Sequence, residues 1–110
     1  MRSIRLTDRC RFSTRRFLPE LVHGSDRVRV FLLCLEPGQG LPARADSEEM
    51  ICYLIEGRAK VMLGEQVITV AAGDLAVAEA GEIRGIEAEE RTVALWVHLS
   101  NRSSSAEEQP

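Results

Sequence analysis

Compared with disulfide-rich or collagen-like proteins, the sequence is poor in cysteine, proline and glycine. It contains three cysteines, four prolines and eight glycines in 110 residues. Because Cys10, Cys34 and Cys52 are odd in number and widely spaced, we expect free, mostly buried thiols rather than a disulfide framework or a zinc ribbon. Hydrophobic residues make up 45% and charged residues 28%, which excludes a wholly disordered or collagen-like chain. This length fits one domain.

Long apolar runs and histidines are also scarce. No uninterrupted apolar run approaches the ~18 residues that span a bilayer, and the arginine-rich start has no apolar stretch of a secretion signal. We therefore expect a cytoplasmic protein without a membrane partner. With His23 and His98 as the only histidines, a single chain cannot assemble a three-histidine metal site.

Positive charge is concentrated at the start of the chain. Residues 1–30 carry a formal charge of +5, whereas residues 31–110 carry −8. Nucleic-acid binding usually comes with a basic domain, but the isoelectric point here is about 5.4, so we expect no nucleic-acid partner. A basic arm over residues 1–17 is instead expected to be solvated or to lie against the acidic body of its own or a neighbouring chain.

Short apolar segments separated by turn residues make up most of the chain after residue 27. These segments cover residues 28–35, 50–55, 59–63, 66–71, 75–78, 83–87 and 92–99. Each has the length of a strand, and none shows a sustained helical period. The pattern predicts an all-β, antiparallel sandwich or barrel.

The two ends of this region are less regular. Residues 16–23 are compatible with one more strand, but Pro19 interrupts it and favours an edge position. The last eleven residues are almost entirely polar, so we expect a disordered tail over residues 100–110. The sequence thus predicts a basic arm, a barrel over residues 18–99 and a tail.

The final segment has two different faces. Trp96 and His98 alternate with the aliphatic side chains of Val93, Leu95 and Val97. The aliphatic face is the better candidate for the core, which leaves Trp96 and His98 for a second sheet, a dimer contact or a binding surface. No carboxylate or nucleophile is tied to His98 in the sequence, so we expect a structural histidine.

The order and separation of the turns resemble the cupin family. Pro37-Gly38 matches the opening turn of that family's first motif, and residues 53–57 resemble the end of the motif's strand. Gly73-Asp74 with Ala80-Gly81 resembles the frame of the second motif. The resemblance covers residues 18–99 and implies a cupin-type antiparallel β-sandwich, or jelly-roll barrel.

The resemblance also implies a metal site, but its ligands are replaced in this chain. The four ligand positions hold Arg44, Asp46, Met50 and Arg84, or Ala43 and Ala45 in place of the first two when the longer motif spacing is used. A guanidinium group stays charged and offers no lone pair to a metal. We therefore expect neither a metal nor another cofactor.

Three functions stay open. In the first, Arg44 and Arg84, with Asp46 beside them, bind a small organic anion over an apolar floor of Met50 and Cys52. In the second, the protein is a cofactor-independent isomerase or epimerase, for which the interior acid–base candidates are Asp46, Glu79 and Cys52.

In the third alternative, the protein is a structural or partner-binding barrel. Its interior is filled by side chains, and the arginines form salt bridges with nearby carboxylates. For any of the three we expect a homodimer, because a small sandwich has exposed sheet edges that a second copy can cover.

Overall fold

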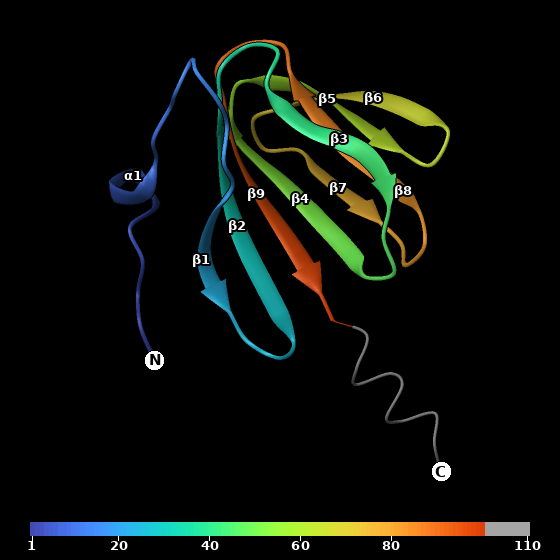
Figure 1. The fold of residues 1–110 in the computed structure, drawn as a ribbon, viewed down its shortest axis with the longest axis horizontal. Coiled ribbons are helices and arrows are strands. Elements are labelled where there is room, and N and C mark those ends of the chain that lie inside the picture. The colour runs from blue at the N-terminus through green and yellow to red at the C-terminus, as the bar shows by residue number, and fades with distance from the viewer. Residues whose placement is uncertain (101–110) are drawn as a thin grey trace.

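The computed structural model describes residues 1–100 and consists of two antiparallel sheets packed face to face (Figure 1). The larger sheet contains, in spatial order, β1 (Glu20–Gly24), β2 (Val28–Leu35), β9 (Thr92–Leu99), β4 (Glu49–Glu56) and β7 (Leu75–Ala78). The smaller sheet contains β3 (Gly40–Ala45), β8 (Ile83–Ala88), β5 (Arg58–Leu63) and β6 (Gln66–Ala71). The prediction of an all-β antiparallel sandwich is therefore confirmed, and the seven predicted segments are all strands.

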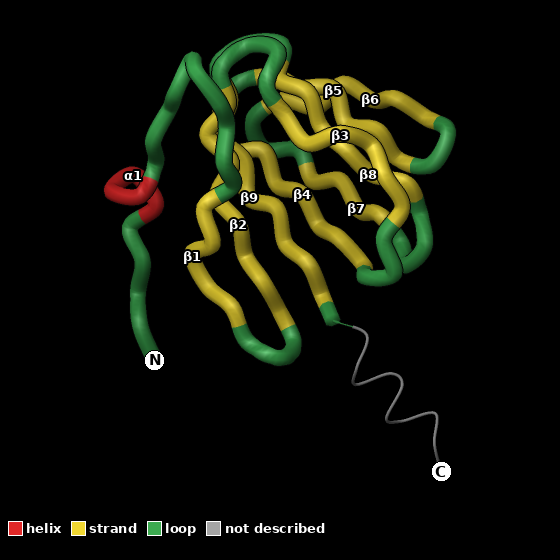
Figure 2. The backbone as a smooth tube through the Cα atoms, in the orientation of Figure 1, coloured by secondary structure: helices red, strands yellow, loops and turns green. Residues whose placement is uncertain are grey.

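Helical structure is minimal, as Figure 2 shows. Within residues 1–100 the one helix is α1 (Leu6–Arg9), a single turn in the amino-terminal arm. No helix in this part of the chain is long and apolar enough to cross a membrane. The predicted tail falls almost entirely on residues 101–110, which lie outside the described residues.

Strand β3 was not predicted, because its sequence lacks the apolar alternation of a half-buried strand. Four of its six residues are exposed, and Pro42 cannot donate a ladder hydrogen bond. The strand lies at the edge of its sheet, paired with β8 alone, and its register shifts between Leu41 and Arg44. This irregularity accommodates the proline and sets Arg44 directly opposite Arg84.

The main core lies between the two sheets. Met50, Cys52 and Leu54 point inward from β4, and each is at most 1% exposed. Trp96 of β9 belongs to the same core and is 3% exposed. The expectation that the aliphatic face of β9 forms this core is therefore wrong, because Val93 faces the other side of the sheet.

That other side is covered by the amino-terminal arm, which packs against side chains of β2 and β9. Figure 1 shows the arm running beside β1 and β2. The arm contributes apolar side chains to a second cluster: Ile4, Leu6, Cys10 and Phe12. Arg9 Nε donates a 2.6 Å hydrogen bond to the Glu20 carboxylate, and Gln39 Nε2 donates one to the carbonyl oxygen of Ser13. The basic arm thus lies against its own barrel, which is one of the three arrangements left open by the sequence.

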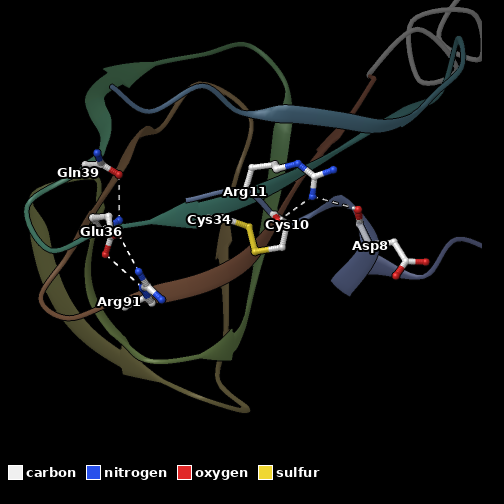
Figure 3. Close-up of a disulfide and its surroundings, with 7 residues drawn as sticks. All are labelled: Asp8, Cys10, Arg11, Cys34, Glu36, Gln39 and Arg91. Atoms are coloured by element: carbon white, nitrogen blue, oxygen red, sulfur yellow. Dashed lines mark hydrogen bonds and ion pairs between the residues drawn. A yellow bond between two sulfur atoms is a disulfide. The ribbon is translucent and has the colours of Figure 1, made fainter. Parts of the chain in front are cut away.

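A disulfide between Cys10 and Cys34 ties the arm to β2 (Figure 3). Their Cα atoms are 6.0 Å apart, although 24 residues separate them in sequence. The expectation of three free thiols is therefore wrong for this pair, because spacing along the chain does not show that the arm folds back onto β2. Cys52 is free and buried, as expected.

Reduction of this disulfide should lower the stability of the protein. Opening a loop of this length restores chain entropy to the unfolded state worth about 3 kcal/mol. We expect a reductant to lower the melting temperature of the wild type, as measured by thermal unfolding, but not that of Cys10→Ser. An equal shift in both proteins would show that the bond between Cys10 and Cys34 contributes nothing.

Candidate functional site

A cavity of about 330 Å³ opens at one end of the barrel, between the two sheets. Phe31 and Leu33 of β2, Leu41 of β3 and Trp96 of β9 form its apolar walls. Its charged lining residues are Arg29, Arg44, Asp46 and Arg84, and the lining also includes His98 and two prolines. Three arginines and one carboxylate give the lining an excess of positive charge.

Arg84 is the most unusual side chain in this lining, because it is charged and only 3% exposed. Its Nε donates to the carbonyl oxygen of Glu82 at 2.7 Å. Its Nη2 donates to the carbonyl oxygens of Glu79 at 2.9 Å and Asp46 at 3.4 Å. The remaining nitrogen, Nη1, is buried and has no hydrogen-bond partner in the part of the chain that the structure describes. The backbone thus positions the guanidinium, and no carboxylate among residues 1–100 forms an ion pair with it.

Arg44 lies opposite Arg84 on the paired strands β3 and β8. Directly opposed residues of antiparallel strands project from the same face, and like charges there repel each other. Arg44 is exposed, and the ion pairs found among residues 1–100 include neither arginine. The structure therefore lacks the salt bridges that the hypothesis of a filled barrel requires for them.

Asp46 does not bind either arginine through its carboxylate. Its Oδ1 accepts a 2.9 Å hydrogen bond from the backbone N–H of Glu48. That bond lowers the pKa of Asp46 most, and the charges of Arg84 and Arg44 lower it further. Asp46 is therefore ionised at neutral pH, but it is held in a turn of the backbone.

His98 and Arg29 are site residues that the sequence analysis did not assign to the site. Arg29 donates to the Glu48 carboxylate, whose Oε1 lies 3.5 Å from Nδ1 of His98. Burial, followed by the charge of Arg29, lowers the pKa of His98, so its imidazole is neutral at pH 7. The shared face of Trp96 and His98 was the one signal in the sequence that pointed to this position.

Met50 and Cys52 are buried as their strand register predicts, but they are not among the residues that line the cavity. Burial raises the pKa of the Cys52 thiol to about 12, so it stays protonated and is a poor nucleophile. Glu79 contributes its carbonyl oxygen to Arg84. Of the five predicted site residues, the cavity therefore brings together Arg44, Asp46 and Arg84.

The residues at the four positions where the resemblance implies metal ligands do not fit a metal. Arg84 uses its guanidinium to donate to carbonyl oxygens, and Met50 lies fully buried in the core. Within residues 1–100, ligand atoms of Asp46, itself one of the four positions, and of Glu48 and His98 lie within 4.8 Å of one another. Because Arg29 already binds Glu48 and two further arginines act on Asp46, positive charge opposes a cation at this second group as well.

The two sheets and the cavity at one end define a cupin-type barrel, a double-stranded β-helix with room for a small molecule. The sequence matches the family model described as "Cupin domain" over residues 31–99, so the chain belongs to the cupin family. No protein of curated function matches the sequence.

Solved structures agree on this fold. An RmlC-like cupin protein from Desulfovibrio desulfuricans is 27% identical with a TM-score of 0.81, covering 90% of this chain and 96% of its own. The structure of TT1209 from Thermus thermophilus is also 27% identical with a TM-score of 0.81, covering 90% and 97%. KdgF from Halomonas sp. is 16% identical with a TM-score of 0.71, covering 81% and 84%, and this likeness shows the fold alone.

Proposed function

We propose that this cupin binds a small organic anion in the cavity at the end of its barrel. The observation that carries the proposal is the guanidinium of Arg84, which is almost fully buried and keeps one nitrogen without an acceptor. An unpaired buried donor costs about 1–3 kcal/mol, and more when the group is charged. A carboxylate or phosphate bound against this guanidinium in the cavity would supply the missing charge, and a small side-chain adjustment at the buried Nη1 would let the anion supply the missing acceptor as well.

The other lining residues support the same ligand class. Arg44 adds a second positive charge on the same face of the sheet, and the exposure of its side chain leaves it free to reorient. Phe31, Leu33 and Trp96 provide an apolar wall that suits a carbon skeleton better than an inorganic ion. A filled structural barrel would leave no such space.

A thermal-shift screen tests the proposal. The panel contains small carboxylates, sugar phosphates and neutral sugars, each at millimolar concentration. A ligand present at about 100 times its Kd stabilises the folded protein by about 2.7 kcal/mol, so a bound anion should raise the melting temperature visibly. The proposal fails if neutral sugars stabilise the protein as well as the anions do.

We further propose that the protein holds no transition metal in stoichiometric amount. The arginine at position 84 and the buried methionine at position 50 offer a cation no suitable ligand. Elemental analysis of protein purified without chelator should find far less than one iron, nickel, zinc or copper per chain. A value near one would contradict the proposal.

A homodimer is the oligomeric state that we propose. Outward-facing apolar side chains line the free end of the larger sheet, where Tyr53 of β4 pairs with Leu75 of β7. Tyr53, Leu75 and Val77 are 41%, 60% and 43% exposed. Light scattering should report a dimer at micromolar concentration and a monomer for Leu75→Glu, whereas a monomeric wild type would overturn the proposal.

A further inference from the structure

His98 is the one histidine in the lining of the cavity, and it shares that lining with Arg84. Its side chain is only 14% exposed, and its ring contacts the Phe31 ring edge to face, with the centroids 5.8 Å apart. The register of β9 places it two residues beyond Trp96, on the same inward face. A molecule bound beside Arg84 therefore lies in the same small space as this imidazole.

The groups around His98 leave it a lone pair. Nδ1 is buried, has no hydrogen-bond partner among the described residues and lies 3.5 Å from the Glu48 carboxylate. A carboxylate on this side favours the tautomer with its hydrogen on Nδ1, which leaves the lone pair on Nε2. Arg29 of β2, Arg84 of β8 and Asp46 also act on the ring, and the two arginines oppose its protonation at neutral pH.

Arg84 has the complementary property. Its guanidinium is a fixed positive charge that is only 3% exposed, and its Nη1 has no acceptor among residues 1–100. Such a group stabilises negative charge that develops on a nearby oxygen far better than the same group in water does. The lining of the cavity therefore combines a proton acceptor, His98, with a group that stabilises an oxyanion, Arg84.

We propose that His98 is a catalytic base, and that the cavity catalyses proton transfer at the carbon next to the carbonyl of a small 2-oxo acid. This inference rests on the anion binding proposed above. The imidazole takes the proton, and the electron pair of the C–H bond moves toward the carbonyl, giving an enolate whose oxygen is stabilised by Arg84. The imidazolium or water then returns a proton to carbon, so the step needs no oxidant, reductant or metal.

Deuterium exchange tests this inference. Pyruvate, 2-oxobutyrate and 2-oxoglutarate are incubated with the protein in D2O, and the signal of the protons next to the carbonyl is followed by NMR. General base catalysis contributes typically 10²–10⁴-fold, so we expect the wild type to exchange at least one of these acids about 100-fold faster than His98→Gln does. The rate should be constant near pH 7 and fall in acid, because the pKa of His98 lies below its ordinary value.

Three controls separate catalysis from a structural role. His23→Gln removes the chain's other histidine, which contacts Arg2 of the arm and not the cavity, and should exchange like the wild type. Saturation-transfer NMR should show that His98→Gln still binds the acid that the wild type exchanges. Exchange should persist with EDTA; if it is lost there and restored by a divalent cation, a metal and not His98 carries the reaction.

The remaining outcomes distinguish this inference from the proposed function. A 2-oxo acid that binds but exchanges no faster than with His98→Gln overturns the catalytic role and leaves anion binding intact. If other anions bind and none of the three acids does, the substrate class is wrong. If no anion binds at all, both proposals fall.

Discussion

Arg84→Met is expected to weaken the binding of the most strongly stabilising anion by roughly ten- to hundredfold. A hydrogen-bonded guanidinium contact to an anion, removed from water, is worth on the order of 1.5–3 kcal/mol, which corresponds to that loss. Arg84→Lys should also impair binding, because lysine retains the charge but not the planar pair of donors. Isothermal titration calorimetry measures both variants against the wild type.

Arg84 also donates to three backbone carbonyls, so its variants can lose stability as well as affinity. Arg44→Gln avoids this difficulty, because Arg44 is exposed and belongs to none of the ion pairs found in residues 1–100. It should weaken the same anion without lowering the melting temperature. Arg58→Gln makes the same change of charge at an exposed position of β5 outside the cavity and should bind like the wild type. If Arg44→Gln and Arg58→Gln lose the same amount of affinity for the anion, the loss comes from the overall charge of the protein and not from the position of Arg44.

Gly85→Ala is expected to destabilise the fold by about 1–3 kcal/mol and to weaken anion binding with it. Gly85 lies in β8 beside Arg84, where a Cβ atom would stand 2.8 Å from the Cα and N atoms of Ala43 in β3. Because two of the three nearest atoms belong to the backbone of β3, that strand must move away, and Arg44 moves with it. Thermal unfolding and titration of the anion measure the two effects.

Gly24→Ala is the matched control for this variant. At that position the nearest heavy atom to a new Cβ lies at 3.6 Å, in ordinary van der Waals contact. The variant should keep the stability and the affinity of the wild type. If Gly85→Ala behaves in the same way, the close approach of β3 to β8 does not determine the geometry of the arginine pair.

The strands could be predicted because their signal is local. Alternating apolar residues and glycine turns identify β4, β5 and β6 without any knowledge of their partners. Strand β3 has no such signal, since it is an edge strand with Pro42 and most of its side chains exposed. Its existence depends on pairing with β8, which a reading of local pattern does not see.

Arg44 and Arg84 could be placed in advance because the family resemblance supplied the register of the motif. The residues that form the floor of the cavity could not be predicted from the sequence. Alternation shows that Met50 and Cys52 face inward, but it does not show which part of the interior is packed and which part is open. The open part lies beside β2 and β9, which is why Arg29 and His98 belong to the lining.

The arm explains the two clearest errors. An aliphatic face on β9 predicts burial, and Val93 and Leu95 are indeed covered, but by the arm rather than by the second sheet. The pairing of Cys10 with Cys34 has the same origin, because it follows from the path of the arm across β2. Neither contact can be recognised until the arm's position is known.

A crystal structure of the protein with its most strongly stabilising anion tests the central claim most directly. The account predicts that a carboxylate or phosphate oxygen of the ligand lies within hydrogen-bond distance of Arg84 Nη1, with the carbon skeleton against Phe31 and Trp96. A ligand bound elsewhere, with Arg84 Nη1 still unpaired beside an empty cavity, would contradict it.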